Sequence, residues 1–181
     1  MDDKLSNLLI YNSSEDILQL ILENITHNQS PETLKIAILD NTLIKYQEYS
    51  VFTDETSKEK MKKHLGLISW INRVIEQRQS EFKESGIGNY SELEGEQLNK
   101  YPKIILLIND VITEFIYAKD FYWAEFRENF SNICLGGQKY GIQVIATVNC
   151  NVREIQHNEA TEWLQPVDAS DFTKEVDLYG Y

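Results

Sequence analysis

PKIILLIND, at residues 102–110, contains the unbroken apolar run 104–108, which is followed by an amide and a carboxylate. A run without polar alternation is typical of a strand covered by helices on both faces of a parallel sheet. Three other apolar segments have the character of strands, and stretches with helical spacing separate the four. The predicted strands are residues 7–11, 34–39, 104–108 and 141–147. Strands that alternate with helices predict an α/β fold with a mostly parallel sheet.

The predicted helices are marked by apolar residues that recur every three or four positions. They cover residues 17–25, 65–82 and 120–134. N-cap candidates at residues 53–56 precede the second helix, and Gly136 with Gly137 is predicted to cap the third. Residues 86–100 are rich in Gly, Ser, Asn and acids, so we expect an exposed loop there.

Length and composition indicate one compact domain. The chain has 181 residues, of which 42% are hydrophobic and 11% aromatic, enough for a sizeable core. We expect a domain over residues 1–150 and an acidic C-terminal extension over residues 151–181 that packs on or beside it. Cys134 and Cys150 are expected to be reduced and structural. The first apolar run is too short for a signal or a membrane span, so we expect a cytoplasmic protein.

The charge excludes some partners. With 29 acidic and 17 basic residues, the formal net charge is −12. Extended binding to nucleic acid needs clustered Lys and Arg, and no long basic run is present, so we expect no nucleic-acid partner.

Polar residues follow the first predicted strand, where ligands bind in parallel α/β sheets. They are Asn12, Ser13, Ser14, Glu15 and Asp16. A phosphate-binding loop needs glycines and a lysine, and this stretch has neither. Its two carboxylates would repel a nucleotide. They could bind a metal, but capping of the following helix is the more ordinary use of such acids.

Asn109 and Asp110 end the strand over residues 104–108, in the place of the acid pair that positions magnesium and activates water in a nucleotide hydrolase. Only one of the two is a carboxylate. The sequence therefore favours a structural Asp110, which caps or hydrogen-bonds neighbouring loops, over a catalytic acid. The three histidines and two cysteines lack metal-ligand spacing, and no nucleophile signature is present. We expect no metal site.

The order of these features resembles the FtsK/SpoIIIE type of P-loop ATPase domain, and most closely the EssC and EccC ATPases of type VII secretion systems. Residues 8–11 match the first strand of the family, with Asn12, Ser13 and Ser14 in place of its glycine-rich loop. Ser30, Pro31 and Glu32 with the acid-ended strand 36–40, and the helix 68–82 with Glu76 and Arg78, match the next segments. Residues 102–110 are similar to the Walker B strand, and residues 137–149 to the sensor strand. The resemblance implies a RecA-like P-loop NTPase fold with helices flanking the central sheet.

Departures from the family pattern concentrate at the nucleotide site. The loop is shortened and lacks its lysine, Asn109 replaces the first Walker B acid, and Gln138 occupies a position where arginine is common. Each change removes positive charge or a metal ligand. The resemblance thus implies a degenerate site that binds no cofactor, with Gln138, Thr147 and Asn149 as sensor or interface residues.

Two functions follow from the resemblance. The first is a non-catalytic module of a type VII secretion machine, which binds the signal of a secreted substrate or regulates neighbouring ATPase domains and can form homo-oligomers. Such a module would lie on the cytosolic side of a membrane-anchored complex and touch the membrane only indirectly. The alternative is an ATPase that hydrolyses Mg-ATP only within a hexamer, with Asp110 polarising water. DNA translocation would need basic loops, which the charge of −12 disfavours.

Overall fold

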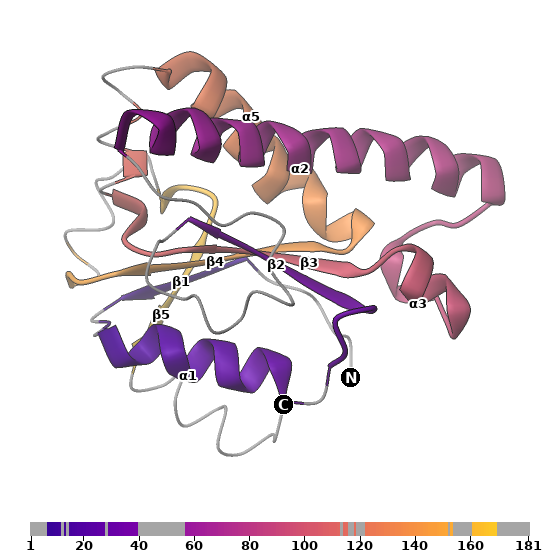
Figure 1. The fold of residues 1–181 in the computed structure, drawn as a ribbon, viewed down its shortest axis with the longest axis horizontal. Helices are drawn as coiled ribbons and strands as arrows, with labels where there is room; N and C mark the ends of the chain where they lie inside the picture. The colour runs from indigo at the N-terminus through magenta and orange to yellow at the C-terminus, as the bar shows by residue number, and fades with distance from the viewer. Residues whose placement is uncertain are drawn as a thin grey trace.

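A five-stranded, all-parallel sheet forms the centre of the molecule (Figure 1). The computed structural model describes residues 7–11, 13, 15–27, 29–39, 57–112, 114–115, 118, 122–151, 153 and 161–169. The strands are β1 (Leu8–Tyr11), β2 (Leu34–Leu39), β3 (Lys103–Ile108), β4 (Ile142–Val148) and β5 (Gln165–Asp168), in the order β2-β3-β4-β1-β5. The four predicted strands and their parallel arrangement are therefore confirmed.

The fifth strand was missed by the sequence analysis. β5 pairs with β1 from Leu8↔Gln165 to Tyr11↔Asp168. It has only four residues, its ends are polar, and it contains Pro166, so it lacks the usual strand pattern. Proline is tolerated because β5 lies at the edge of the sheet. These four residues of the expected extension over 151–181 therefore belong to the sheet itself.

Helices cover both faces of the sheet. Helix α1 (Glu15–Thr26) lies on one face, and α2 (Ser57–Ser85) and α5 (Trp123–Gly136) lie on the other (Figure 1). The three predicted helices are confirmed, with α5 beginning at Trp123. The predicted N-caps at residues 53–56 lie outside the described residues.

One prediction about a connection was wrong. Residues 86–100, expected to be a loop, contain the 3₁₀ helix η2 (Tyr90–Glu92) and the short helix α3 (Glu96–Lys100). The expected cap of α5 is confirmed, because the helix ends at Gly136 and the N–H of the C-cap residue Gly137 donates to the Ile133 carbonyl. Gly137 is right-handed, with φ −61°, and the chain continues as η3 (Gly137–Tyr140). Gly141, which follows η3, is left-handed with φ 77° and lets the chain turn into β4.

Side chains alternate between two hydrophobic cores, which explains the unbroken apolar run of β3. Ile104, Leu106 and Ile108 face the core under α2 and α5. Ile105 and Leu107 face the core under α1. Both faces of β3 are thus covered, as expected for a central strand of a parallel sheet.

The described part of the C-terminal segment packs on α5. Leu164 is buried in the core under α2 and α5. The Trp163 ring lies edge-on to Phe130, with centroids 6.0 Å apart, and Arg127 lies over the Trp163 ring and pairs with Glu162 at 3.1 Å. Residues 161–169 therefore belong to the same folded unit as β1–β4.

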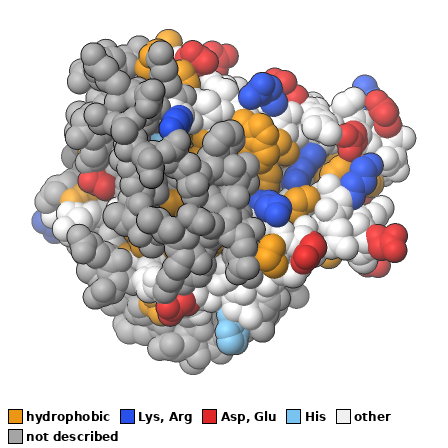
Figure 2. Space-filling view, viewed as in Figure 1, with side chains coloured by type: hydrophobic (Ala, Val, Ile, Leu, Met, Phe, Trp, Pro, Cys, Tyr) orange, Lys and Arg blue, Asp and Glu red, His pale blue; other side chains and the backbone are white. Residues whose placement is uncertain are grey.

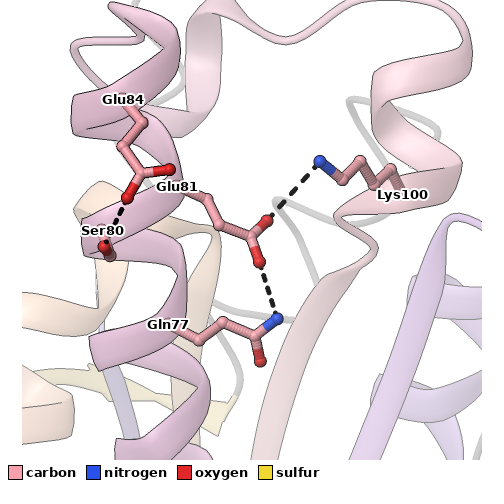
Figure 3. Close-up of polar contacts among 5 residues, drawn as sticks. All are labelled: Gln77, Ser80, Glu81, Glu84 and Lys100. Atoms are coloured by element: carbon pink, nitrogen blue, oxygen red, sulfur yellow. Dashed lines mark hydrogen bonds and ion pairs between the residues drawn. The ribbon is translucent and has the colours of Figure 1, made fainter.

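Helix α2 extends beyond the sheet, where α3 lies beside it (Figure 1). Figure 3 shows Glu81 on α2 between two partners: Gln77 Nε2 donates to it at 2.7 Å, and Lys100 Nζ of α3 lies at 3.6 Å. On the described part of the face in Figure 2, basic and acidic side chains are interspersed. Among the described helices, none combines the length and apolar character needed to cross a bilayer.

Candidate functional site at the carboxyl edge of the sheet

The carboxyl edge, where the parallel strands end, has its topological switch point between β1 and β4. After β1 the chain crosses to β2 at one edge of the sheet, and after β4 it crosses to β5 at the other. β1 and β4 are direct neighbours, with Tyr11 opposite Val148. Ligands of open α/β sheets bind outside such a point.

The connection that follows β1 is short and is bonded to β4. Only residues 12–14 separate β1 from α1, which begins with Glu15 and Asp16. Ser13 is buried, and its backbone N–H donates to the carbonyl of Val148 at 3.3 Å. A phosphate-binding loop directs its N–H groups at the anion. The Ser13 N–H is directed at β4 instead.

Asn109, Asp110 and Thr147 form a hydrogen-bonded group at the ends of β3 and β4. The Thr147 hydroxyl donates to Asn109 Oδ1 at 3.1 Å and accepts from the Asp110 N–H at 3.3 Å. Thr147 is only 1% exposed. A hydroxyl has one proton, and that proton is directed at Asn109.

Asp110 has an unusual backbone conformation. Its φ is 51°, in the left-handed region, where Asp is one of the better-tolerated residues. Its carbonyl accepts from the Glu114 N–H at 3.2 Å, so it also begins the helical residues that follow β3. These contacts involve the backbone, and the role of the Asp110 carboxylate stays a prediction.

The other residues predicted for the site are not part of the hydrogen-bonded group of Asn109, Asp110 and Thr147. Asn149 directly follows β4 and is exposed, at the same edge. Gln138 lies in η3, before β4, and its carbonyl accepts from Gly141 N–H. Gln138 precedes β4, whereas Thr147 lies near the carboxyl end of this seven-residue strand. The structure therefore does not bring Gln138 to the site. Asn12 and Ser14, and the side chains of Glu15 and Asp16, lie outside the described part of the structure.

Metal ligands would be needed at this edge for a Mg-nucleotide to bind. Within the described ranges, no group of three or more His, Cys, Asp or Glu side chains is placed to hold a metal ion. The first Walker B position carries Asn109, whose oxygen accepts from Thr147.

Two buried polar residues of α2 contribute to this architecture: His64, which the sequence analysis missed, and Arg78, which it matched only as part of a family motif. His64 Nδ1 lies 2.7 Å from Glu114 Oε2, near the carboxyl edge. Arg78, at the amino edge, donates from Nη1 to the Tyr140 carbonyl and from Nη2 to the Pro102 carbonyl, both at 2.7 Å. Burial lowers the pKa of Arg78, although nearby Tyr90 and Glu81 oppose this. The sequence signal for Arg78 is its place, with Glu76, in the helix that resembles the family, whereas His64 directly precedes the predicted helix over residues 65–82.

Comparisons with known proteins place this geometry among ATPase folds. No protein-family model matches the sequence, and no curated protein matches it significantly. Solved structures do match. EssC (ATPases 2 and 3) from Geobacillus thermodenitrificans has a TM-score of 0.62 and 19% identity, over 97% of this chain and 34% of that one. EccC (ATPases 2 and 3) from Thermomonospora curvata, in complex with a signal sequence peptide, has a TM-score of 0.67 and 16% identity, over 92% of this chain and 31% of that one.

The conjugation coupling protein TcpA of pCW3, in a monomer form with ATPgS, has a TM-score of 0.67 and 14% identity, over 93% of this chain and 51% of that one. The fold is therefore that of a RecA-like P-loop ATPase domain, as predicted. In particular, it is similar to the ATPase domains of the type VII secretion proteins EssC and EccC. The chain spans about a third to a half of the lengths of these three matched proteins.

Proposed function

We propose that this chain is a non-catalytic, ATPase-like module of a type VII protein secretion machine. It binds a protein, either the signal of a secreted substrate or a neighbouring ATPase domain, rather than hydrolysing ATP. The fold shared with EssC and EccC supports the secretion context. The EccC structure holds a signal sequence peptide, which supports a peptide or protein as the partner.

The observation that carries the proposal is the short connection after β1, with the backbone of Ser13 bonded to β4. Three residues leave no room for a loop that wraps a phosphate, and the N–H of Ser13 is bonded to Val148. In the sequence, α1 begins with Glu15 and Asp16, and the stretch from Asn12 to Asp16 has no lysine such as a nucleotide-binding protein supplies. Negative charge beside a helix N-terminus is stabilising for the helix, but it repels a polyphosphate.

The Thr147 group supports the same proposal. In this group the single hydroxyl proton already has an acceptor in Asn109, and the hydroxyl oxygen already has a donor in Asp110. A phosphate would have to displace these internal bonds. Leaving their buried partners unsatisfied costs about 1–3 kcal/mol per group.

Isothermal titration with Mg-ATP tests the proposal. We expect no saturable heat, because the described residues of this edge include neither a phosphate cradle nor a metal-binding acid pair. A cooperative thermal unfolding transition of the same sample serves as the control that the protein is folded. Saturable binding at micromolar affinity would refute the non-catalytic assignment.

Location and assembly follow the proposed role. The module is placed on the cytosolic side of a membrane-anchored secretion complex and contacts the membrane only through that assembly. Its partners are proteins, including other ATPase domains and possible further copies of this chain. No cofactor is required for this role.

A second function, ATP hydrolysis only within a hexamer, is favoured by one observation. Asp110 remains at the end of β3, beside Thr147, where a water-polarising acid would be needed. However, a neighbouring subunit cannot supply the phosphate loop that this chain lacks. The Asp110→Asn variant of the complete assembly tests this alternative: unchanged ATPase activity would eliminate it, and loss of activity would favour it over the first proposal.

A further inference from the structure

His64 and Glu114 form a buried polar contact between two separate elements. His64 lies on α2, and Glu114 lies among the helical residues that follow β3. Their side chains are 8% and 6% exposed, and Nδ1 lies 2.7 Å from Oε2. At this distance one proton must lie between the two atoms, whichever of the groups carries it.

The same contact is connected to the carboxyl edge. The Glu114 N–H donates to the Asp110 carbonyl at 3.2 Å. The Asp110 N–H in turn donates to Thr147. We call Asn109 and Asp110, with these bonds, the Asp110 turn. A continuous series of hydrogen bonds therefore runs from α2 through Glu114 to the Asp110 turn.

We propose that His64 and Glu114 act as a latch that couples α2 to the Asp110 turn and holds Asp110 in its left-handed conformation. A left-handed non-glycine residue persists only where its surroundings hold it. The Glu114 residue supplies two such restraints, since its backbone binds the turn and its side chain binds α2.

The latch has a consequence that does not depend on whether the edge binds nucleotide. A partner that shifts α2 changes the position of Glu114 and thereby the Asp110 turn. By linkage, a ligand that changes the turn alters the affinity of α2 for its partner to the same degree.

Amide hydrogen exchange by NMR on the full chain tests this coupling. The reporters are the Asp110 and Glu114 amides, and the reference is the Ile104 amide, which is bonded to the Gly141 carbonyl at the opposite edge. Global destabilisation accelerates exchange at both edges, whereas loss of the latch accelerates it first at the turn.

We expect His64→Ala and Glu114→Ala each to raise exchange at the reporters by at least about tenfold more than at Ile104. The double variant should show no further increase, because each single change already opens the latch. Glu114→Gln, whose amide can still donate to a neutral His64, should have a smaller effect.

Asn72→Ala is the matched control. It removes a different contact of α2, the 2.8 Å hydrogen bond from Asn72 Nδ2 to the Asn129 carbonyl, and should affect both edges equally. If the alanine variants do not fold, Glu114→Asp is used instead, because it keeps the charge and moves the carboxylate away from His64. We expect it to raise amide exchange at Asp110 by about threefold more than at Ile104. Equal exchange at both edges in the latch variants, or additive effects in the double variant, would overturn the proposal.

Discussion

Arg78 is a buried cation that ties α2 to the starts of β3 and β4. Its guanidinium donates to the Pro102 and Tyr140 carbonyls, and the side chain is almost fully buried. Replacing it with alanine leaves both carbonyls without this donor and removes its packing, so we expect a loss of about 2–4 kcal/mol in the free energy of unfolding. Arg78→Lys should recover only part of this free energy, since one ammonium group does not reproduce the two planar guanidinium donors.

Urea unfolding measures these changes. The exposed Arg73 on the same helix provides the control, and Arg73→Ala should stay within about 0.5 kcal/mol of the parent. Similar losses in Arg73→Ala and Arg78→Ala would contradict the role assigned to Arg78.

Two glycines of the chain should respond in opposite directions to alanine. Gly141 has φ 77°, and an added Cβ would overlap the Tyr90 ring. Gly66 lies in the middle of α2 with no atom near its added Cβ. We expect Gly141→Ala to cost more than about 1 kcal/mol, and Gly66→Ala to gain about 0.5–1 kcal/mol from helix propensity. Thermal unfolding distinguishes the two, and a neutral Gly141→Ala would show that the tight turn into β4 is misplaced.

Residues of the candidate site differ in how far sequence could locate them. Asn109, Asp110 and Thr147 were predictable, because the ends of neighbouring parallel strands must meet at one edge. The His64–Glu114 contact was not, since the two residues are 50 positions apart on different helices and no local pattern pairs them.

At the scale of elements, the contact between α2 and α3 should depend on pH. The hydrogen bond from Gln77 lowers the pKa of Glu81, with further contributions from Tyr101 and Lys100 (Figure 3). A lowered carboxyl pKa stabilises the fold above the ordinary glutamate value of 4.5, and this contribution is lost as pH falls through the lowered value.

Glu81→Gln should therefore reduce stability at neutral pH but not at low pH. Because Glu81 is partly exposed, the difference should be below about 1 kcal/mol. Urea unfolding of both proteins across this range measures it. Glu84→Gln, a charge change one turn away on the same helix, is the control, and a difference for Glu81→Gln that persists at low pH would refute this account.

The helices and strands that carry a regular pattern of buried apolar residues were predictable from the sequence. β3 was evident because both its faces are buried, and α2 was evident because its buried side recurs every three or four residues. β5 carried no such pattern, since it is short and contains Pro166 and is held by pairing with β1. Its position depends on a distant partner that the local sequence does not reveal.

At the scale of the whole molecule, the segment around β5 should contribute to the stability of the single folded unit. Leu164 is 7% exposed and packs in the core under α2 and α5. Leu164→Ala should cost about 2–4 kcal/mol through lost burial and a cavity. The neighbouring exposed Glu162→Ala should cost less than about 1 kcal/mol. A single cooperative urea transition shifted only by the first variant is the expected result, whereas an unshifted midpoint for Leu164→Ala would separate this segment from the core.

We propose that the described polar groups of the carboxyl edge bond to one another and that this edge does not bind ATP. An amide NMR titration of the folded chain with Mg-ATP tests it most directly, because the Ser13 and Asp110 amides are both held by internal hydrogen bonds at this edge. We predict that neither resonance shifts in a saturable way. Saturable, magnesium-dependent shifts of both amides at micromolar ATP would contradict the account.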